Sequence, residues 1–270
     1  MPSERANRPR VSLPIDGTPS IVDTSRNTSL KGSMLVVGFP THGLVGSVAA
    51  SYLLHSLDMK PVGYMLSDCF PPTVVMEDGI VSAPVRFYAS RIVCGVNGKC
   101  NQLVVCISDI QPQPELLNHI GTSILDWAES KKINLVVAVE GQPVQEPIGS
   151  DVRVVAMANR AASTLLDKYR FERANGVVTG FAGAILLSSV SRQTPVLCLV
   201  AQAHREYPDA RAAARVIETI NPLVPQLVLD TKPLHDKARQ IETEMRRSIA
   251  QQKESMTQLG GTSTPSEMYR

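Results

Sequence analysis

Apolar runs of strand length, separated by helical segments, constrain the fold of this chain more than any other feature. Met34–Phe39 and Asn134–Glu140 are two such runs, and Pro195–Ala201 is a third. Runs without alternating polar residues are typical of strands that are buried on both faces of a sheet. Strands that alternate with helices predict a mainly parallel α/β sheet, right-handed in its crossovers and covered by helices on both faces.

Helical segments lie between and after these runs. The spacing of apolar residues predicts helices over Leu44–Leu57, Pro114–Lys131, Asn159–Tyr169, Phe181–Val190 and Asp209–Ile220. Pro114–Lys131 carries its apolar residues on one stripe, which is typical of a helix that covers a sheet. Phe181–Val190 is apolar almost all round, which predicts a buried helix.

One part of the sheet is expected to be antiparallel. Val85–Val93 and Gln102–Ile107 are β-rich runs that flank an Asn97-Gly98 turn. Asn-Gly between two such runs is the strongest short-range signal for a β-hairpin. Pro61–Leu66 and Thr73–Met76 are two further short strand candidates.

Both ends of the chain differ in composition from the α/β domain, which we place at residues 34–232. Residues 1–33 are rich in Pro, Ser, Thr, Asn and Arg without periodicity, which predicts a flexible arm. Residues 233–258 are polar with a thin apolar stripe, which predicts a helix that lies along the domain or pairs with a copy of itself. Residues 259–270 are expected to form a flexible tail that reaches roughly 35–40 Å when extended.

Composition and charge argue against several classes of function. The chain is 43% hydrophobic, which is enough for a sizeable core, and its net charge of +2 without a basic cluster indicates neither nucleic acid nor an anionic membrane as a partner. Its apolar runs are far shorter than the roughly 18 residues of a membrane span. The N-terminus lacks the apolar core of a signal peptide, so we expect a soluble, cytoplasmic protein.

The cysteines and histidines indicate neither a metal site nor a cofactor. The five cysteines include no Cys-x-x-Cys pair, and Cys94, Cys106 and Cys198 lie in apolar runs, as buried small residues do. A disulfide between Cys94 and Cys100 across the expected hairpin is disfavoured in a reducing compartment. The histidines show no ligand spacing with one another.

The segment Gly38–Ser47 connects the first apolar strand to a helix, the place where α/β folds bind phosphate. Five of its residues are candidates for an anion-binding turn: Thr41, His42, Gly43, Gly46 and Ser47. The order of residues fits neither the Walker loop nor the dinucleotide fingerprint. The alternative interpretation is structural, because glycines also allow a tight turn and close packing of helix on sheet.

His42 and several acids are the candidates for acid–base chemistry. His42 lies in the same turn, and histidine is the side chain that ordinarily titrates near neutrality. The acids near predicted strand ends are Asp68, Glu77, Asp78, Glu140 and Glu146. No motif joins His42 to any of these acids, and neither Gly-x-Ser-x-Gly nor His-Glu-x-x-His occurs.

Three segments in succession resemble one known family. They are Gly38-Phe-Pro with Gly43-Leu-Val-Gly46, then Gly176-Val-Val-Thr-Gly180-Phe-Ala-Gly183, then Tyr207-Pro-Asp209-Ala-Arg-Ala-Ala. The small residues of the second segment also suit close approach of a helix to the sheet. The order and spacing resemble the proteasome assembly chaperone family, in its archaeal homo-oligomeric branch, over roughly residues 34–250. This resemblance implies a three-layer α/β/α sandwich similar to purine nucleoside phosphorylase. It also implies no enzymatic activity and no cofactor, with proteasome α subunits and other copies of the chain as partners.

Some archaeal members of that family carry a tail of a hydrophobic residue, tyrosine and any last residue, which docks between α subunits of the proteasome core particle. Met268, Tyr269 and Arg270 match these positions one by one, and the carboxylate of Arg270 is the group to be captured. Methionine is a softer anchor than leucine or valine, and several weak tails in a homo-oligomer would compensate for it. The resemblance thus implies a non-enzymatic assembly chaperone or ATP-independent activator. The alternative is a phosphorylase- or ligase-like enzyme that binds an anionic small molecule at Gly38–Ser47.

Overall fold

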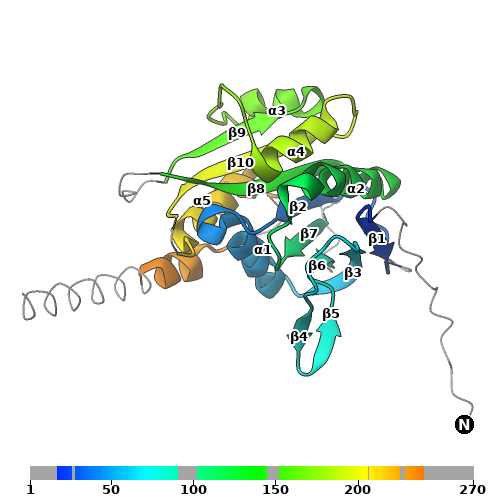
Figure 1. Cartoon of the computed structure of the whole chain (residues 1–270). Helices are drawn as coiled ribbons and strands as arrows, with labels where there is room; N and C mark the ends of the chain where they lie inside the picture. The colour runs from blue at the N-terminus through cyan, green and yellow to red at the C-terminus, as the bar shows by residue number, and fades with distance from the viewer. Residues whose placement is uncertain are drawn as a thin grey trace, which may run out of the picture.

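An eight-stranded sheet in the order β1-β3-β6-β7-β2-β8-β10-β9 forms the centre of the protein (Figure 1). The computed structural model describes residues 17–25, 28–90, 102–144, 152–205, 207–225 and 229–239. The strands of the sheet are β1 (Ser20–Asp23), β2 (Met34–Gly38), β3 (Met59–Leu66), β6 (Val85–Ser90), β7 (Leu103–Ser108), β8 (Leu135–Pro143), β9 (Val154–Ala158) and β10 (Val196–Ala203). The helices are α1 (Val45–Ser56), α2 (Leu117–Ser130), α3 (Ser163–Lys168), α4 (Gly180–Ser189) and α5 (Ala210–Ile220). The predicted α/β class is confirmed.

Four adjacent strands, β7, β2, β8 and β10, run parallel and form the middle of the sheet. β6, β3 and β1 follow antiparallel on one side, and β9 is antiparallel to β10 on the other. Every residue of β2 and β7 is buried, as apolar runs without polar alternation predict. The mainly parallel central sheet is confirmed, and its antiparallel flanks are larger than the single hairpin that the sequence predicts.

Helices cover both faces of the sheet, and the side chains of β2 alternate between the two faces. Leu35 and Val37 belong to the apolar core that α2 and α4 complete. Met34 and Val36 belong to a second core, which α1 and α5 complete on the opposite face. This alternation gives the three layers that the family resemblance implies.

Helices α2 and α4 lie side by side on one face, and a glycine sets their spacing. A Cβ on Gly121 of α2 would lie only 3.2 Å from the Cα of Ile185 on α4. Phe181 and Ile185 are buried, but Leu187 is 65% exposed and Val190 at the end of the helix is 72% exposed. The prediction of a buried helix is therefore confirmed only for the inner side of α4, because this helix lies in an outer layer and its other side does not meet the sheet.

The predicted flexible arm over residues 1–33 needs a correction within its described part. Ser20–Asp23 forms the edge strand β1, which pairs antiparallel with β3. Leu30 is buried in the core that α2 and α4 complete. The pairing with β3 supplies the order that the local composition does not indicate. Residues 1–16 lie outside the described residues.

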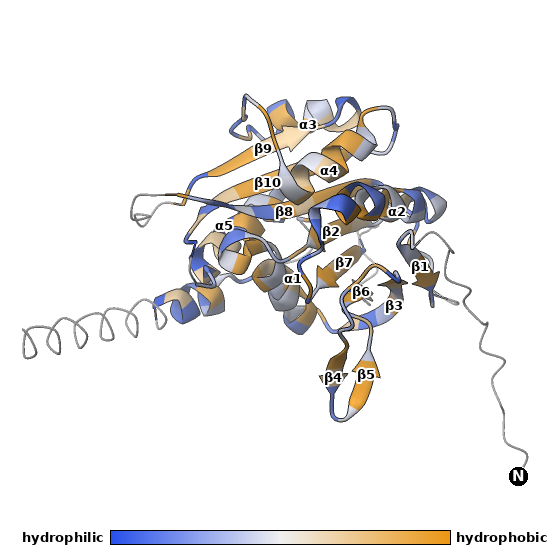
Figure 2. Cartoon of the chain, in the orientation of Figure 1, coloured by the Kyte–Doolittle hydropathy of each residue, from blue (hydrophilic) through white to orange (hydrophobic). Residues whose placement is uncertain are grey.

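A small separate hairpin projects from the sheet and exposes apolar side chains to solvent. It consists of β4 (Val75–Glu77) and β5 (Ile80–Ser82), which are coloured toward the hydrophobic end of the scale in Figure 2. Met76 is 69% exposed and Ile80 is 74% exposed. The strand candidate Thr73–Met76 overlaps β4 only at Val75 and Met76, and β4 pairs outside the main sheet.

Two other predicted features are described only in part. The antiparallel pairing of β6 with β7 agrees with the predicted hairpin, but residues 91–101, which include Asn97-Gly98 and two of the cysteines, lie outside the described residues. Residues 232–239 are helical, and Leu234 and Ala238 pack into the core on the α1 and α5 side. The remainder of the predicted helix over residues 233–258, and the tail over residues 259–270, lie outside the described residues.

Across the ranges that the structure describes, no helix combines the length and the apolar character needed to cross a membrane.

Candidate functional site

The segment between β2 and α1 forms a tight turn that packs on the ends of β8 and β10. Gly43 has a φ of +60°, and a Cβ there would lie 2.8 Å from the Cβ of Ala203. The carbonyl oxygen of Gly43 accepts a hydrogen bond of 2.7 Å from the backbone N–H of Asp209. A Cβ on Gly46 would lie 2.7 Å from the carbonyl oxygen of Val139. These contacts support the structural interpretation of the two glycines, since each position leaves no room for a side chain.

The other three residues of the predicted anion-binding turn lie in different surroundings. The hydroxyl of Thr41 accepts a 3.0 Å hydrogen bond from the backbone N–H of Gly141, which ties the turn to β8. The hydroxyl oxygen of Ser47 is buried and has no hydrogen-bond partner within the described residues. His42 is exposed and lines a cavity.

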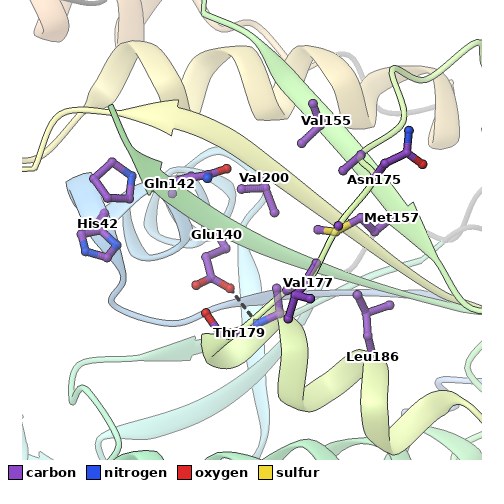
Figure 3. Close-up of a pocket in the computed structure, with 16 residues that line it drawn as sticks. His42, Glu140, Gln142, Val155, Met157, Asn175, Val177, Thr179, Leu186 and Val200 are labelled. Carbon is purple, nitrogen blue, oxygen red and sulfur yellow. Dashed lines mark hydrogen bonds between the residues drawn. The ribbon is translucent and has the colours of Figure 1, made fainter. Parts of the chain in front are cut away.

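That cavity, of about 470 Å³, lies beside the carboxyl end of β8 (Figure 3). His42 lines it from the turn before α1, and Glu140 and Gln142 line it from β8. Met157 on β9 and Val200 on β10 form the apolar side of the cavity. A further wall comes from residues 174–179, which lead into α4. Ligand sites in α/β folds are commonly found at this end of the parallel strands, and the volume lies in their usual range of about 300–1,000 Å³.

Glu140 is the charged group of this cavity, and it also caps helix α4. Its Oε2 accepts a 2.7 Å hydrogen bond from the backbone N–H of Ala182, in the first turn of the helix. Thr179, the N-cap residue, makes no capping hydrogen bond with its own side chain. Burial raises the pKa of the Glu140 carboxyl above its ordinary value, and the hydrogen bond from Ala182 offsets part of that rise.

A glycine makes the space for this carboxylate. Gly180 has a φ of +74°, and a Cβ there would lie 2.9 Å from Oε1 of Glu140. Gly183, a second small residue of the same segment, packs against the backbone of Val178. A Cβ added at Gly183 would lie 2.6 Å from the carbonyl oxygen of Val178. The sequence suggested close approach of helix to sheet here. The structure instead shows contacts with the Glu140 carboxylate and with the backbone just before α4.

The acids near predicted strand ends are dispersed, and only one of them lies with His42. Glu140 shares the cavity with His42, whereas Asp68 is exposed after β3. Glu77 and Asp78 line a second cavity of about 560 Å³ beside the β4–β5 hairpin. Glu146 lies outside the described residues.

Sequence reasoning did not anticipate the polar residues that surround Glu140. They are Gln142, Asn175 and Thr179. The available signal was Gly176 and Gly180, which both adopt positive φ and shape the segment that forms one wall of the cavity.

Replacing Glu140 by glutamine is expected to stabilise the protein at neutral pH, because glutamine keeps an oxygen for the Ala182 N–H and cannot ionise. The folded state raises the pKa of this carboxyl above 4.5, so the folded protein binds the proton more tightly than the unfolded chain. The contribution of Glu140 to the free energy of unfolding is therefore highest below about pH 4.5 and falls as pH rises through the raised pKa. The advantage of Glu140→Gln should grow over the same window.

Urea unfolding of the wild type and of Glu140→Gln at a series of pH values from about 4 to 8 measures this difference. Glu115→Gln is the matched control, since Glu115 is exposed and lines neither cavity. A constant difference between wild type and Glu140→Gln over the whole range would contradict the assigned environment of Glu140.

Neither cysteine chemistry nor a metal centre is evident in the described ranges. Cys106 and Cys198 are buried, as predicted, and burial raises the pKa of both thiols, so they remain protonated. Cys69 is exposed. Among the described residues, no three His, Cys, Asp or Glu side chains gather closely enough to hold a metal ion.

The predicted docking residues Met268, Tyr269 and Arg270 lie outside the described residues. The docking role of these three residues therefore stays a prediction.

The fold and the position of its cavity define a class: a three-layer α/β/α protein with an open cavity at the carboxyl end of its parallel strands. The model of the PAC2 family matches residues 35–249, and the chain belongs to this family. The family resemblance that the sequence motifs indicated is therefore confirmed.

Solved structures and sequence relatives agree with this assignment. PbaA of Pyrococcus furiosus, described as an archaeal homologue of proteasome-assembly chaperone, is 26% identical with a TM-score of 0.72, covering 89% of this chain and 96% of PbaA. PbaB of the same organism, described as an archaeal proteasome activator, is 20% identical with a TM-score of 0.73, covering 86% of this chain and 99% of PbaB, which shows a shared fold. An uncharacterized protein of Methanocaldococcus jannaschii, MJ0106, is 25% identical over 229 residues, covering 83% of this chain and 88% of the relative.

Proposed function

We propose that this protein is a non-enzymatic partner of the proteasome, acting as an assembly chaperone or as an ATP-independent activator. The observation that carries the proposal is the similarity to PbaA, which extends over 89% of this chain at 26% identity. The fold shared with PbaB, an archaeal proteasome activator, supports the same conclusion. The partner in this proposal is the α ring of the proteasome core particle, which the protein meets in the cytoplasm.

The proposed contact is made by the carboxyl-terminal residues. Tyr269 and Met268 would fill a cleft between neighbouring α subunits, and the carboxylate of Arg270 would pair with a basic residue there. In a homo-oligomer, residues 34–232 would form the ring and the helix over residues 233–258 would direct the tails toward one face. Each docked tail then makes the next docking event intramolecular, so individually weak tails can give strong binding.

Size-exclusion chromatography with purified archaeal proteasome core particles tests this contact. Deletion of residues 268–270 is expected to remove the protein from the core-particle fraction, and Tyr269→Ala should have nearly the same effect. One extra residue after Arg270 should also abolish binding, because it moves the carboxylate away from the position that the pocket captures.

Ser266→Ala is the matched control, since it changes the same tail without touching the three proposed docking positions. Circular dichroism and the elution volume of each variant alone show whether fold and oligomer are intact. Undiminished co-elution of the deletion variant would refute the role of the tail and leave the family assignment unaffected.

A second candidate function is a phosphorylase- or ligase-like enzyme that binds an anion at the Gly38–Ser47 turn. The observation in its favour is that His42 shares a cavity with Glu140. The carboxylate in the same cavity works against an anionic ligand, because like charges at short range repel. Thermal stabilisation by millimolar phosphate, nucleosides or nucleotides would support the enzyme, and no stabilisation by any of them would count against it.

A further inference from the structure

We propose that the cavity beside Glu140 binds a small organic cation, an ammonium group carried on an apolar body. The proposal concerns the α/β body alone and does not depend on the carboxyl-terminal tail or on the proteasome. It differs from the anion-binding turn expected from the sequence in the sign of the ligand's charge and in the residues involved.

The charge of the cavity is the first argument. Glu140 is partly buried, and its one hydrogen bond comes from the Ala182 N–H to Oε2. Within the described residues, Oε1 accepts no hydrogen bond, and the carboxylate forms no ion pair with a lysine or arginine. Carboxylates removed from water are ordinarily paired with a cation, so Oε1 is the position at which a ligand ammonium would be held.

The other side chains that line the cavity offer little positive charge to pair with Glu140 in place of a ligand. His42 is the one basic side chain among the described residues that line it. The polar side chains of Gln142, Asn175 and Thr179 are neutral and offer oxygen acceptors to an ammonium group. The carboxylate of Glu140 among mostly neutral lining residues therefore favours a cationic ligand over an anionic one.

The shape and the apolar walls define the rest of the ligand. Val155, Met157, Val200 and Leu186 line the cavity from β9, β10 and α4, on one side of Glu140 in Figure 3. Val177 lies in the segment before α4 and is 94% exposed, so an apolar ligand would remove part of its surface from water. A volume of about 470 Å³ suits a small molecule with a ring or a branched chain better than a single unbranched side chain.

Three probes with the same phenyl body and different charge test the proposal: 2-phenylethylammonium, the neutral 2-phenylethanol and the anionic 3-phenylpropanoate. Binding is measured by isothermal titration, and the methyl NMR signal of Met157, assigned with Met157→Leu, reports whether the probe occupies this cavity. The ammonium probe is expected to bind at least about tenfold more tightly than the alcohol, because it can form a charge-assisted hydrogen bond to Oε1. It should also shift the Met157 signal.

Glu140→Gln is expected to remove the preference for the ammonium probe while the protein stays folded, since the α4 cap is kept. Glu115→Gln, which makes the same change of charge at an exposed position, should bind the probe as the wild type does. The proposal is overturned if the ammonium binds no better than the alcohol, if the propanoate binds best, or if Glu140→Gln binds the ammonium unchanged.

N-acetyl-lysine N-methylamide distinguishes a free small molecule from a lysine side chain of another protein, because it carries the same ammonium on a flexible stem. Weaker binding than 2-phenylethylammonium supports a small-molecule site. Tighter binding would overturn that assignment and identify a protein side chain as the natural cation.

Discussion

Replacing Gly38 by alanine is expected to destabilise the protein by about 3 kcal/mol or more, a large part of the stability of a typical domain. Gly38 ends β2, where α1 crosses over the sheet. A Cβ there would overlap the carbonyl oxygen of Gly46 and would lie 2.8 Å from the Cβ of Ala50. A backbone atom cannot rotate away as a side chain does, so α1 would have to move from its place in the core.

Urea unfolding followed by far-UV circular dichroism measures the effect, and a loss of soluble protein would be its extreme form. Gly79→Ala is the matched control, since a Cβ at this position, in the turn of the β4–β5 hairpin, has nothing within 4 Å. Its cost is limited to the positive φ of +76°, about 1 kcal/mol. Equal unfolding midpoints for Gly38→Ala and wild type would show that α1 does not pack as described.

Replacing Asn159 by alanine is the second substitution with a large expected effect, about 2–5 kcal/mol. Asn159 is only 7% exposed and uses its whole side-chain amide. Nδ2 donates to the carbonyl oxygens of Ser189 at 3.2 Å and Thr194 at 2.9 Å. Oδ1 accepts from the backbone N–H groups of Ala162 and Val196, both at 3.1 Å. One side chain thus joins the end of β9, the end of α4 and the start of β10.

The cost comes from buried backbone groups that lose their partners. The Ala162 N–H also bonds the Asn159 carbonyl oxygen, and the Ser189 carbonyl oxygen also accepts from the Arg192 N–H, so those two groups keep a second partner. The carbonyl oxygen of Thr194 and the N–H of Val196 have no such substitute among the described hydrogen bonds. Each unsatisfied group costs about 1–3 kcal/mol.

Asn134→Ala provides the comparison, since Asn134 is exposed and its side chain makes no hydrogen bond with the described residues. Its effect should stay within about 0.5 kcal/mol. If urea unfolding gives the same free energy for Asn159→Ala as for Asn134→Ala, the amide of Asn159 does not hold these elements together.

The central strands and their helices could be predicted because local pattern and tertiary environment agree there. β2, the first half of β8 (Leu135–Val139) and most of β10 are apolar, which suits strands that have neighbours on both sides and helices on both faces. β1 could not be predicted, since its four residues are ordered by pairing with β3, about forty residues later. The exposure of Leu187 and Val190 could not be predicted either, because an apolar sequence does not show whether other elements of the fold pack against it.

The cavity was predictable only in fragments. Glu140 stood out as an acid near a strand end, and His42 as a histidine in a turn. Their meeting depends on β8, on the turn before α1 and on the segment before α4, which are far apart in sequence. The sign of the expected ligand was taken from the helix terminus at Gly38–Ser47. The carboxylate on which the proposed cation site rests comes from another strand and caps a different helix.

The position of β2 also governs when the chain can fold during synthesis. Its two partners, β7 and β8, begin about seventy and about one hundred residues after it, so the residues next to β2 in the sequence cannot supply its sheet pairing. A nascent chain must keep the fully apolar segment Met34–Gly38 from wrong partners until β8 leaves the ribosome. Truncations before residue 143 should therefore aggregate, and the rate of refolding should be set by closure of these long loops.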